Sequence, residues 1–156
     1  MARPGKLTED QRLVWKAYRD LFQGLSEVLH AQLASDAGLS GSEYAVLVEL
    51  SHAPDHVLRA RELCAALGWD RSRLSHLAAR MAKRGLVARE ECADDARGSM
   101  VRLTDSGLAA VEDAAHEHSE AIRRYFFNPL SSDERDTLAA LLHRLLDNLE
   151  QDQAHP

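Results

Sequence analysis

Polar and cationic side chains gather on one face of the segment 70–104, which reads DRSRLSHLAARMAKRGLVAREECADDARGSMVRLT. A helix over 71–84 would bury apolar side chains that recur at i, i+3, i+4 and i+7, namely Leu74, Leu77, Ala78 and Met81. The opposite face holds Ser72, His76, Arg80 and Lys83, with Arg73 and Ser75 flanking it. Arginine can pair bidentately with guanine, and serine or histidine can reach base edges and phosphates. The chemistry predicted for this face is therefore recognition of DNA.

The charge of the chain is segregated along its length. The net charge of −6 taken alone argues against a nucleic-acid partner, but residues 59–102 carry +4 and the remainder carries −10. A basic patch on an acidic body orients a protein on a polyanion without making it adhere everywhere. The 156 residues are enough for one domain, 1–156, with a core of Leu, Val and Ala. No apolar run of membrane-spanning length occurs and no signal peptide is evident. The two cysteines, Cys64 and Cys92, do not make a disulfide framework, so a reducing cytoplasm is expected.

The elements that must position this face follow from hydrophobic periodicity and capping signals. Helices are predicted over 8–34, from the capping box at Ser40–Glu43 to about 51, over 59–67, over 71–84, over 105–127 and after the second capping box at 131–134. Strands are predicted at about 86–92 and 99–104, joined by a loop over 93–98. The fold class is mainly α with a small β wing.

Two successive helices, 59–67 and 71–84, joined by a turn at Gly68-Trp69, form a helix-turn-helix whose second helix would enter the major groove. The hairpin could then reach the flanking minor groove, with Arg97 at its loop held by Asp94 or Asp95. Arg59 and Arg71 lie near helix starts and would position the protein on phosphates. The alternative is that the charged face is merely solvated.

The same residues resemble the multiple-antibiotic-resistance regulator (MarR) family of bacterial transcription factors. The resemblance rests on Trp69–His76, Arg80-Met81, Arg84–Val87, Asp95–Gly98, Val101–Thr104 and Gly107, in register over about residues 8–150. It implies a homodimer on a pseudo-palindromic operator, with the winged lobe at 42–104 and dimerisation helices at 8–34 and 105–151. Ser72, Arg73, Ser75, His76 and Arg80 would face the major groove. Arg97 would enter the minor groove with Asp95 as its tether, although Ala96 stands where relatives often have a second basic residue.

The terminal helices also predict the dimer directly. The apolar side chains of 8–34 are expected on the buried side of that helix: Leu13, Ala17, Leu21, Leu25, Val28 and Leu29. Together with the leucine stripe of the last helix, 138–149, they form more surface than one small winged domain can cover. The alternative is that the two helices pack on each other within one chain.

Five residues are candidates for an effector or redox site, and each also has a simpler structural explanation. Trp15, Tyr18 and Arg19 could line a pocket for a small-molecule effector of unknown identity, or the aromatic pair could be ordinary core. Cys64 is expected to be an inert buried thiol. Cys92 lies at the wing, where basic neighbours could lower the pKa of its thiol and make it a redox sensor, but the acidic Glu90 and Glu91 act in the opposite direction.

Metal and enzyme chemistry are not expected. His116 and His118 point to nearly opposite sides of a helix and are read as solvated surface rather than as metal ligands. No Gly-rich phosphate loop, nucleophile elbow or paired acid occurs, so neither a cofactor nor catalysis is expected. The function predicted is a sequence-specific regulator that represses by occupying its operator. The alternative is a protein-binding winged helix, or a DNA mimic that contacts another regulator. A mimic would have acidic side chains where the helix 71–84 has basic ones.

Overall fold

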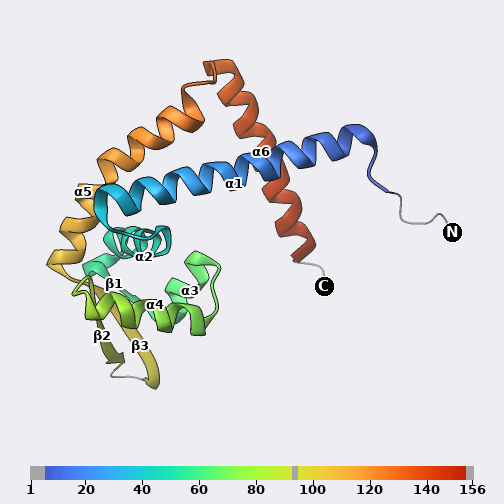
Figure 1. The fold of residues 1–156 in the computed structure, drawn as a ribbon. Coiled ribbons are helices and arrows are strands. Elements are labelled where there is room, and N and C mark those ends of the chain that lie inside the picture. Colours follow the sequence, from blue (N-terminus) through green and yellow to red (C-terminus); the bar gives the residue numbers. More distant parts are fainter. Residues whose placement is uncertain (1–5, 93–94, 154–156) are drawn as a thin grey trace. The chain divides into compact units, whose positions relative to one another are not determined.

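The structure, a computed structural model, describes residues 6–92 and 95–153, and the side chains of 91–98 and 152–153 are outside that description. The elements in chain order are α1 (Glu9–Ala37), α2 (Gly41–His52), η1 (Pro54–His56), β1 (Val57–Arg59), α3 (Ala60–Leu67), α4 (Arg71–Lys83), β2 (Val87–Cys92), β3 (Asp95–Leu103), α5 (Asp105–Ile122), the π-helical turn η2 (Arg123–Phe127) and α6 (Ser132–Gln153) (Figure 1). They fall into two compact units, Met1–Ser119 and Glu120–Pro156, and each is described by itself.

Capping side chains and left-handed glycines set the helix boundaries in the first unit. Thr8 and Ser40 are N-caps with complete capping boxes, so the side chains satisfy amides that the first helical turn leaves unpaired. α1 ends at Gly38, whose φ of 62° lies in the left-handed region that glycine adopts without strain. The predicted helices over 8–34, 59–67 and 71–84 are thus present with small shifts at their ends.

The core of the first unit is a single apolar cluster to which each of its helices contributes. Its fully buried side chains are Leu33, Leu39, Val46, Leu47, Leu50, Leu63, Leu74, Met81 and Val101. The four positions predicted to form the inner face of 71–84 are all buried, at 3% exposure or less. Burial of a Leu or Met side chain contributes about 1.5–3 kcal/mol, so this cluster fixes which face of α4 remains outside.

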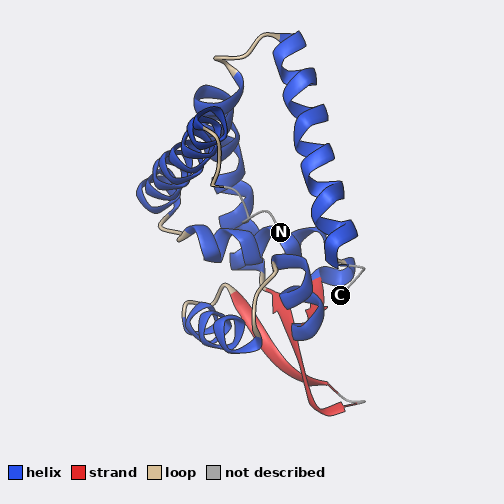
Figure 2. Ribbon diagram, turned by 90° about the vertical axis from the view of Figure 1, so that its right-hand side faces the viewer, coloured by secondary structure: helices blue, strands red, loops and turns tan. Residues whose placement is uncertain are grey.

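The sheet has three antiparallel strands in the order β1-β3-β2, and β1 was not predicted. β1 is only three residues long and pairs with β3 through Val57–Arg102 and Arg59–Met100. β3 begins at Asp95, so the prediction of a loop through Gly98 is wrong for 95–98. The hairpin is longer than expected because β2 and β3 continue pairing to Cys92 and Asp95 across an irregularity after Glu91. Figure 2 shows this hairpin extending beyond the helices of the unit.

The start of α5 is locked to the hairpin base. Thr104 Oγ1 lies 2.6 Å from the carbonyl oxygen of Gly85 and 3.0 Å from that of Leu86, and it accepts the Gly107 N–H at 3.0 Å. A Cβ at Gly107 would overlap the carbonyl oxygen of Leu86. This close approach requires glycine, and it fixes the wing against the helix that follows it.

Two expectations for the long helices need correction. The prediction that 105–127 is one α-helix is wrong at its end, where the chain widens into a π-helical turn over 123–127 and the Asn128 N–H donates to the carbonyl oxygen of Arg123, five residues earlier. The prediction that Leu13, Leu21 and Val28 of α1 are buried is also wrong, since they are 58%, 53% and 37% exposed. Only the end of α1, around Leu33, enters the core.

The second unit presents a long apolar stripe. On α6, five leucines are between 41% and 62% exposed: Leu141, Leu142, Leu145, Leu146 and Leu149. Among the described residues, no helix combines the length and the apolar composition needed to span a membrane.

Candidate nucleic-acid interface

α4 begins on a well-formed cap. The Asp70 carboxylate accepts the backbone N–H of Arg73 at 2.9 Å. This hydrogen bond, with a further one from the Ser72 backbone, holds the pKa of Asp70 below its usual range. The cap occupies amide groups that would otherwise be unpaired, so the start of the helix has one defined direction.

The other end of α4 is tied to α1 and α2 by Arg84. Its guanidinium donates to Glu43 Oε1 at 2.7 Å and to the carbonyl oxygen of Gly38 at 2.9 Å. Burial would raise the pKa of Glu43, but hydrogen bonds from Ser40 and Arg84 outweigh it and lower that pKa. Glu43 is only 7% exposed, so a charged group is held inside the unit because both oxygens have donors. Both ends of α4 are therefore fixed.

The outer face of α4 is free for a partner. Among the residues that the structure describes, the side chains of this face are exposed and form no internal hydrogen bond or ion pair: Ser72, Arg73, Ser75, His76 and Arg80. These are the positions assigned above to the major groove. Donor groups that the fold leaves unused are available to base edges and phosphates.

One member of this face has an aromatic neighbour that the sequence analysis did not assign to the site. The Cζ atom of Arg73 lies 4.0 Å from the centroid of the Trp69 ring. Trp69 is half-buried against the core and its backbone N–H donates to the Cys64 carbonyl oxygen at 2.9 Å. The signal in the sequence was the position of Trp69 directly before the Asp70 cap, since an apolar residue before the N-cap often packs on the start of the helix.

The two arginines proposed as phosphate contacts occupy helix starts. Arg71 is the first residue of α4 and is exposed, and Arg59 is half-buried between β1 and α3. The Arg59 backbone N–H donates to Glu62 Oε2 at 3.2 Å.

The base of the hairpin is braced by an ion pair across β2 and β3. Arg102 donates from Nε to Glu90 Oε1 at 2.7 Å and from Nη1 to the carbonyl oxygen of Asp55 at 3.4 Å. The same contact holds the pKa of Glu90 below its usual range. Asp95 and Arg97 belong to the backbone of β3, but their side chains lie outside the described residues. The predicted roles of Arg97 and Asp95 remain predictions.

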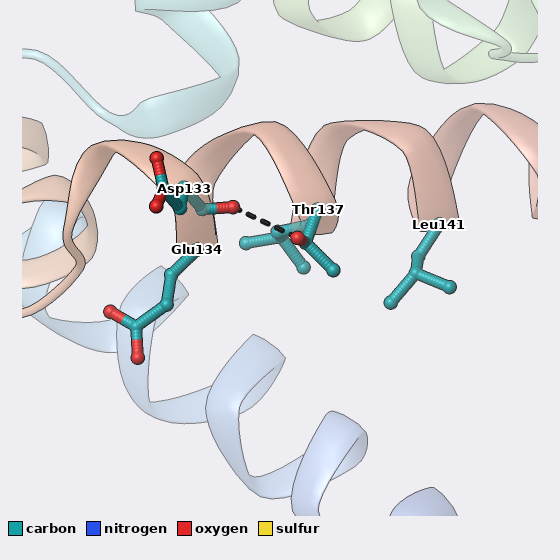
Figure 3. A pocket seen from close by; sticks show the side chains of 5 residues that line it. Asp133, Glu134, Thr137 and Leu141 are labelled. Atoms are coloured by element: carbon teal, nitrogen blue, oxygen red, sulfur yellow. Dashed lines mark hydrogen bonds between the residues drawn. The ribbon is translucent and has the colours of Figure 1, made fainter.

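The residues suggested for an effector pocket lie on the exposed part of α1. Trp15 and Tyr18 are 54% and 52% exposed, with ring centroids 5.4 Å apart, and Arg19 is exposed beside them. The alternative that the pair forms ordinary core is therefore wrong for the chain as described. A hollow elsewhere, shown in Figure 3, is lined by residues of α6 alone: Asp133, Glu134, Thr137, Leu138 and Leu141.

Of the predictions for cysteine and histidine, the burial of Cys64 is confirmed and the exposure of His118 is wrong. Cys64 is buried at 8% exposure, as predicted for an inert thiol, whereas the side chain of Cys92 is outside the description. The reading of His118 as solvated surface is wrong. Its ring packs on Tyr44 with centroids 4.7 Å apart and Nδ1 lies 3.0 Å from Gln32 Oε1. Within the described residues, no group of three or more His, Cys, Asp or Glu side chains could hold a metal ion.

The fold and this surface define a winged helix-turn-helix protein. α3 and α4 form the helix pair, with Gly68 and Trp69 in the turn, and β1, β2 and β3 form the wing sheet. The family model described as "MarR family" matches residues 37–98, which include all of these elements up to the start of β3.

Known proteins extend the match over nearly the whole chain. The crystal structure of Sco3205, a MarR family transcriptional regulator from Streptomyces coelicolor in complex with DNA, is 36% identical, with a TM-score of 0.88 over 94% of this chain and 92% of that one. AbsC, a MarR family regulator of the same species, is 30% identical, with a TM-score of 0.87 over 94% of this chain and 99% of that one. The transcriptional repressor MprA of Escherichia coli is 26% identical over 90% of this chain and 76% of its own length. The chain belongs to the MarR family of transcriptional regulators.

Proposed function

We propose that this protein is a homodimeric, sequence-specific DNA-binding transcriptional regulator that represses by occupying a pseudo-palindromic operator. The observation that carries the proposal is the outer face of α4, where, among the residues described, five exposed donor side chains form no internal hydrogen bond or ion pair on a helix fixed at both ends. The solved complex of the relative Sco3205 with DNA supports it. A DNA mimic would carry acids on this face.

Within this proposal each residue has a role. Ser72, Arg73, Ser75, His76 and Arg80 read the major groove, and Arg59 and Arg71 contact phosphates. Arg97 of the hairpin enters the minor groove, where the negative potential is concentrated, with Asp95 as its tether.

The dimer is proposed to form through the terminal helices, α1 with α5 and α6. The apolar side chains of α1 and the leucines of α6 are exposed in a single chain, and a surface of this kind is expected to be covered by a second copy. A two-fold dimer places two copies of α4 on successive major grooves about 34 Å apart.

The protein is proposed to act in the cytoplasm, without catalysis, cofactor, metal or membrane partner. A small-molecule effector bound near Trp15, Tyr18 and Arg19 would act by favouring one spacing of the two recognition helices.

The test is fluorescence-anisotropy titration of the purified protein against duplexes from its own upstream intergenic region, with random DNA of equal length as control. We expect an affinity about a thousandfold or more above random DNA, and a steep decrease with salt. Equal and weak binding to both duplexes would favour the alternative that the winged helix binds another protein. Absence of binding at low salt would overturn the proposal.

A further inference from the structure

We infer that Trp69 is a positioning residue for DNA recognition: its indole ring holds the guanidinium of Arg73 in a stacked arrangement at the start of α4. The inference rests on the proposed function and adds a residue to it. It starts from the distance of 4.0 Å between Arg73 Cζ and the centroid of the Trp69 ring.

The indole is a fixed platform. The Trp69 backbone is held by its hydrogen bond to the Cys64 carbonyl oxygen at 2.9 Å, next to Gly68 in the left-handed conformation at the end of α3. One side of the residue packs against the apolar core. The Asp70 cap immediately after it fixes the direction of α4. The ring therefore keeps its place when the long Arg73 side chain moves.

Arg73 has no hydrogen-bonded partner that competes with the ring, although the Asp70 carboxylate attracts it electrostatically. Among the described residues its guanidinium forms no hydrogen bond or ion pair, and the residue is exposed. An arginine in this situation would otherwise sample many rotamers, and ordering it on DNA would oppose binding.

Stacking leaves the reading groups of arginine available. A guanidinium placed over an aromatic ring uses its π-face for that contact, and its N–H donors lie in the plane and point away from the ring. A guanine edge needs two such in-plane donors, one for O6 and one for N7. The Trp69 ring thus restricts the position of the Arg73 guanidinium, and the N–H donors that pair with the base stay available.

The test is a double-mutant cycle on operator and random DNA. We expect Trp69→Leu to lower operator affinity about 5- to 30-fold, which corresponds to about 1–2 kcal/mol, from the upper end for exposed cation–π contacts to the value for desolvated ones. Random-DNA affinity should change less than twofold. In the Arg73→Ala background the same substitution should change operator affinity less than twofold. Trp69→Phe, which keeps an aromatic face, should lose less than about threefold.

Arg71→Ala is the matched control, because Arg71 is an exposed arginine of the same turn and stacks on no aromatic ring of the described residues. Its effect should add to that of Trp69→Leu. An unchanged operator affinity for Trp69→Leu, equal loss on random DNA, or full additivity with Arg73→Ala would each overturn the inference. If Trp69→Leu is unfolded at the assay temperature, Trp69→Phe replaces it in the double-mutant cycle. Its smaller loss of operator affinity should then be seen in the wild-type background and not in the Arg73→Ala background.

Nuclear magnetic resonance of the free protein separates this inference from the proposed function. The Arg73 δ protons should show a ring-current shift that disappears in Trp69→Leu. If the shift is present but the wild-type protein does not prefer its operator, the proposed function fails. If the operator is recognised but the shift is absent, the positioning role of Trp69 fails.

Discussion

The guanidinium of Arg84 donates to Glu43 Oε1 at 2.7 Å, across 41 positions of sequence, and joins the end of α4 to the first turn of α2. The pair is asymmetric, since the side chain of Glu43 is 9% exposed and that of Arg84 is 45% exposed. A buried carboxylate of this kind is stabilised by its donors rather than by its charge alone. It holds the recognition helix in the unit that carries it.

Glu43→Ala should therefore destabilise the protein. We expect a loss of about 2–4 kcal/mol in the free energy of unfolding, because the guanidinium and the Ser40 amide lose their acceptor at a largely buried site. Urea unfolding followed by circular dichroism measures it. Lys16→Ala, which breaks an exposed ion pair with Asp20 on α1, should change stability by less than about 1 kcal/mol. Similar effects for both variants would contradict the structural role of Glu43.

His118 should make stability depend on pH. Burial, together with the nearby His30, lowers the pKa of His118. Its neutral ring is favoured in the folded protein. The unfolded chain takes up a proton as pH falls below about 6.5, so stability should decrease from there down to the lowered folded pKa and then level off. Thermal melting of wild type and His118→Gln at pH 7.5 and 5.5 tests this. The melting temperature of His118→Gln should fall less between pH 7.5 and pH 5.5 than that of the wild type. An equal fall in both proteins would refute the assignment. His52→Gln, at an exposed position, is the control.

Arg73→Ala should weaken operator binding and relax base preference. The expected loss is about 1–3 kcal/mol on the operator, since a bidentate arginine–guanine pair contributes about this much discrimination. Anisotropy titrations on a set of single-base operator variants measure both quantities. A loss of the same size on operator and random DNA would contradict base reading.

Arg97→Ala should weaken binding and leave major-groove preference in place. An arginine in the minor groove contributes mainly electrostatic attraction, which is stronger where the groove is narrow. The salt slope of binding should therefore become shallower by about one. Unchanged affinity and slope would remove the wing from the mechanism.

The leucine stripe of α6 should be required for the dimer. Leu145→Glu with Leu149→Glu should give a monomer at micromolar concentration in sedimentation velocity, because charges would be buried without partners in the interface. Arg144→Glu, exposed on the same helix, changes charge without removing an apolar group and should leave the sedimentation coefficient unchanged. A wild-type monomer at this concentration would refute the proposed dimer.

The sequence predicted the elements that depend on neighbouring residues. The inner face of α4 and the capping boxes at Ser40 and Ser131 are set by side chains within one or two turns. The helix pair and hairpin followed from the same local signals, and with them the winged helix-turn-helix and the face that would read DNA.

Tertiary structure decided what depends on distant pairing. β1 is a strand only because residues 57–59 meet β3 more than 40 positions later, and three residues carry too weak a local preference to reveal it. His118 is half-buried because α5 brings it to Tyr44 and Gln32, although its own helix reads as surface. Arg84 likewise finds Glu43 only in the fold. Local propensities act through the chain itself, whereas these contacts form when packing of the apolar core places remote side chains together.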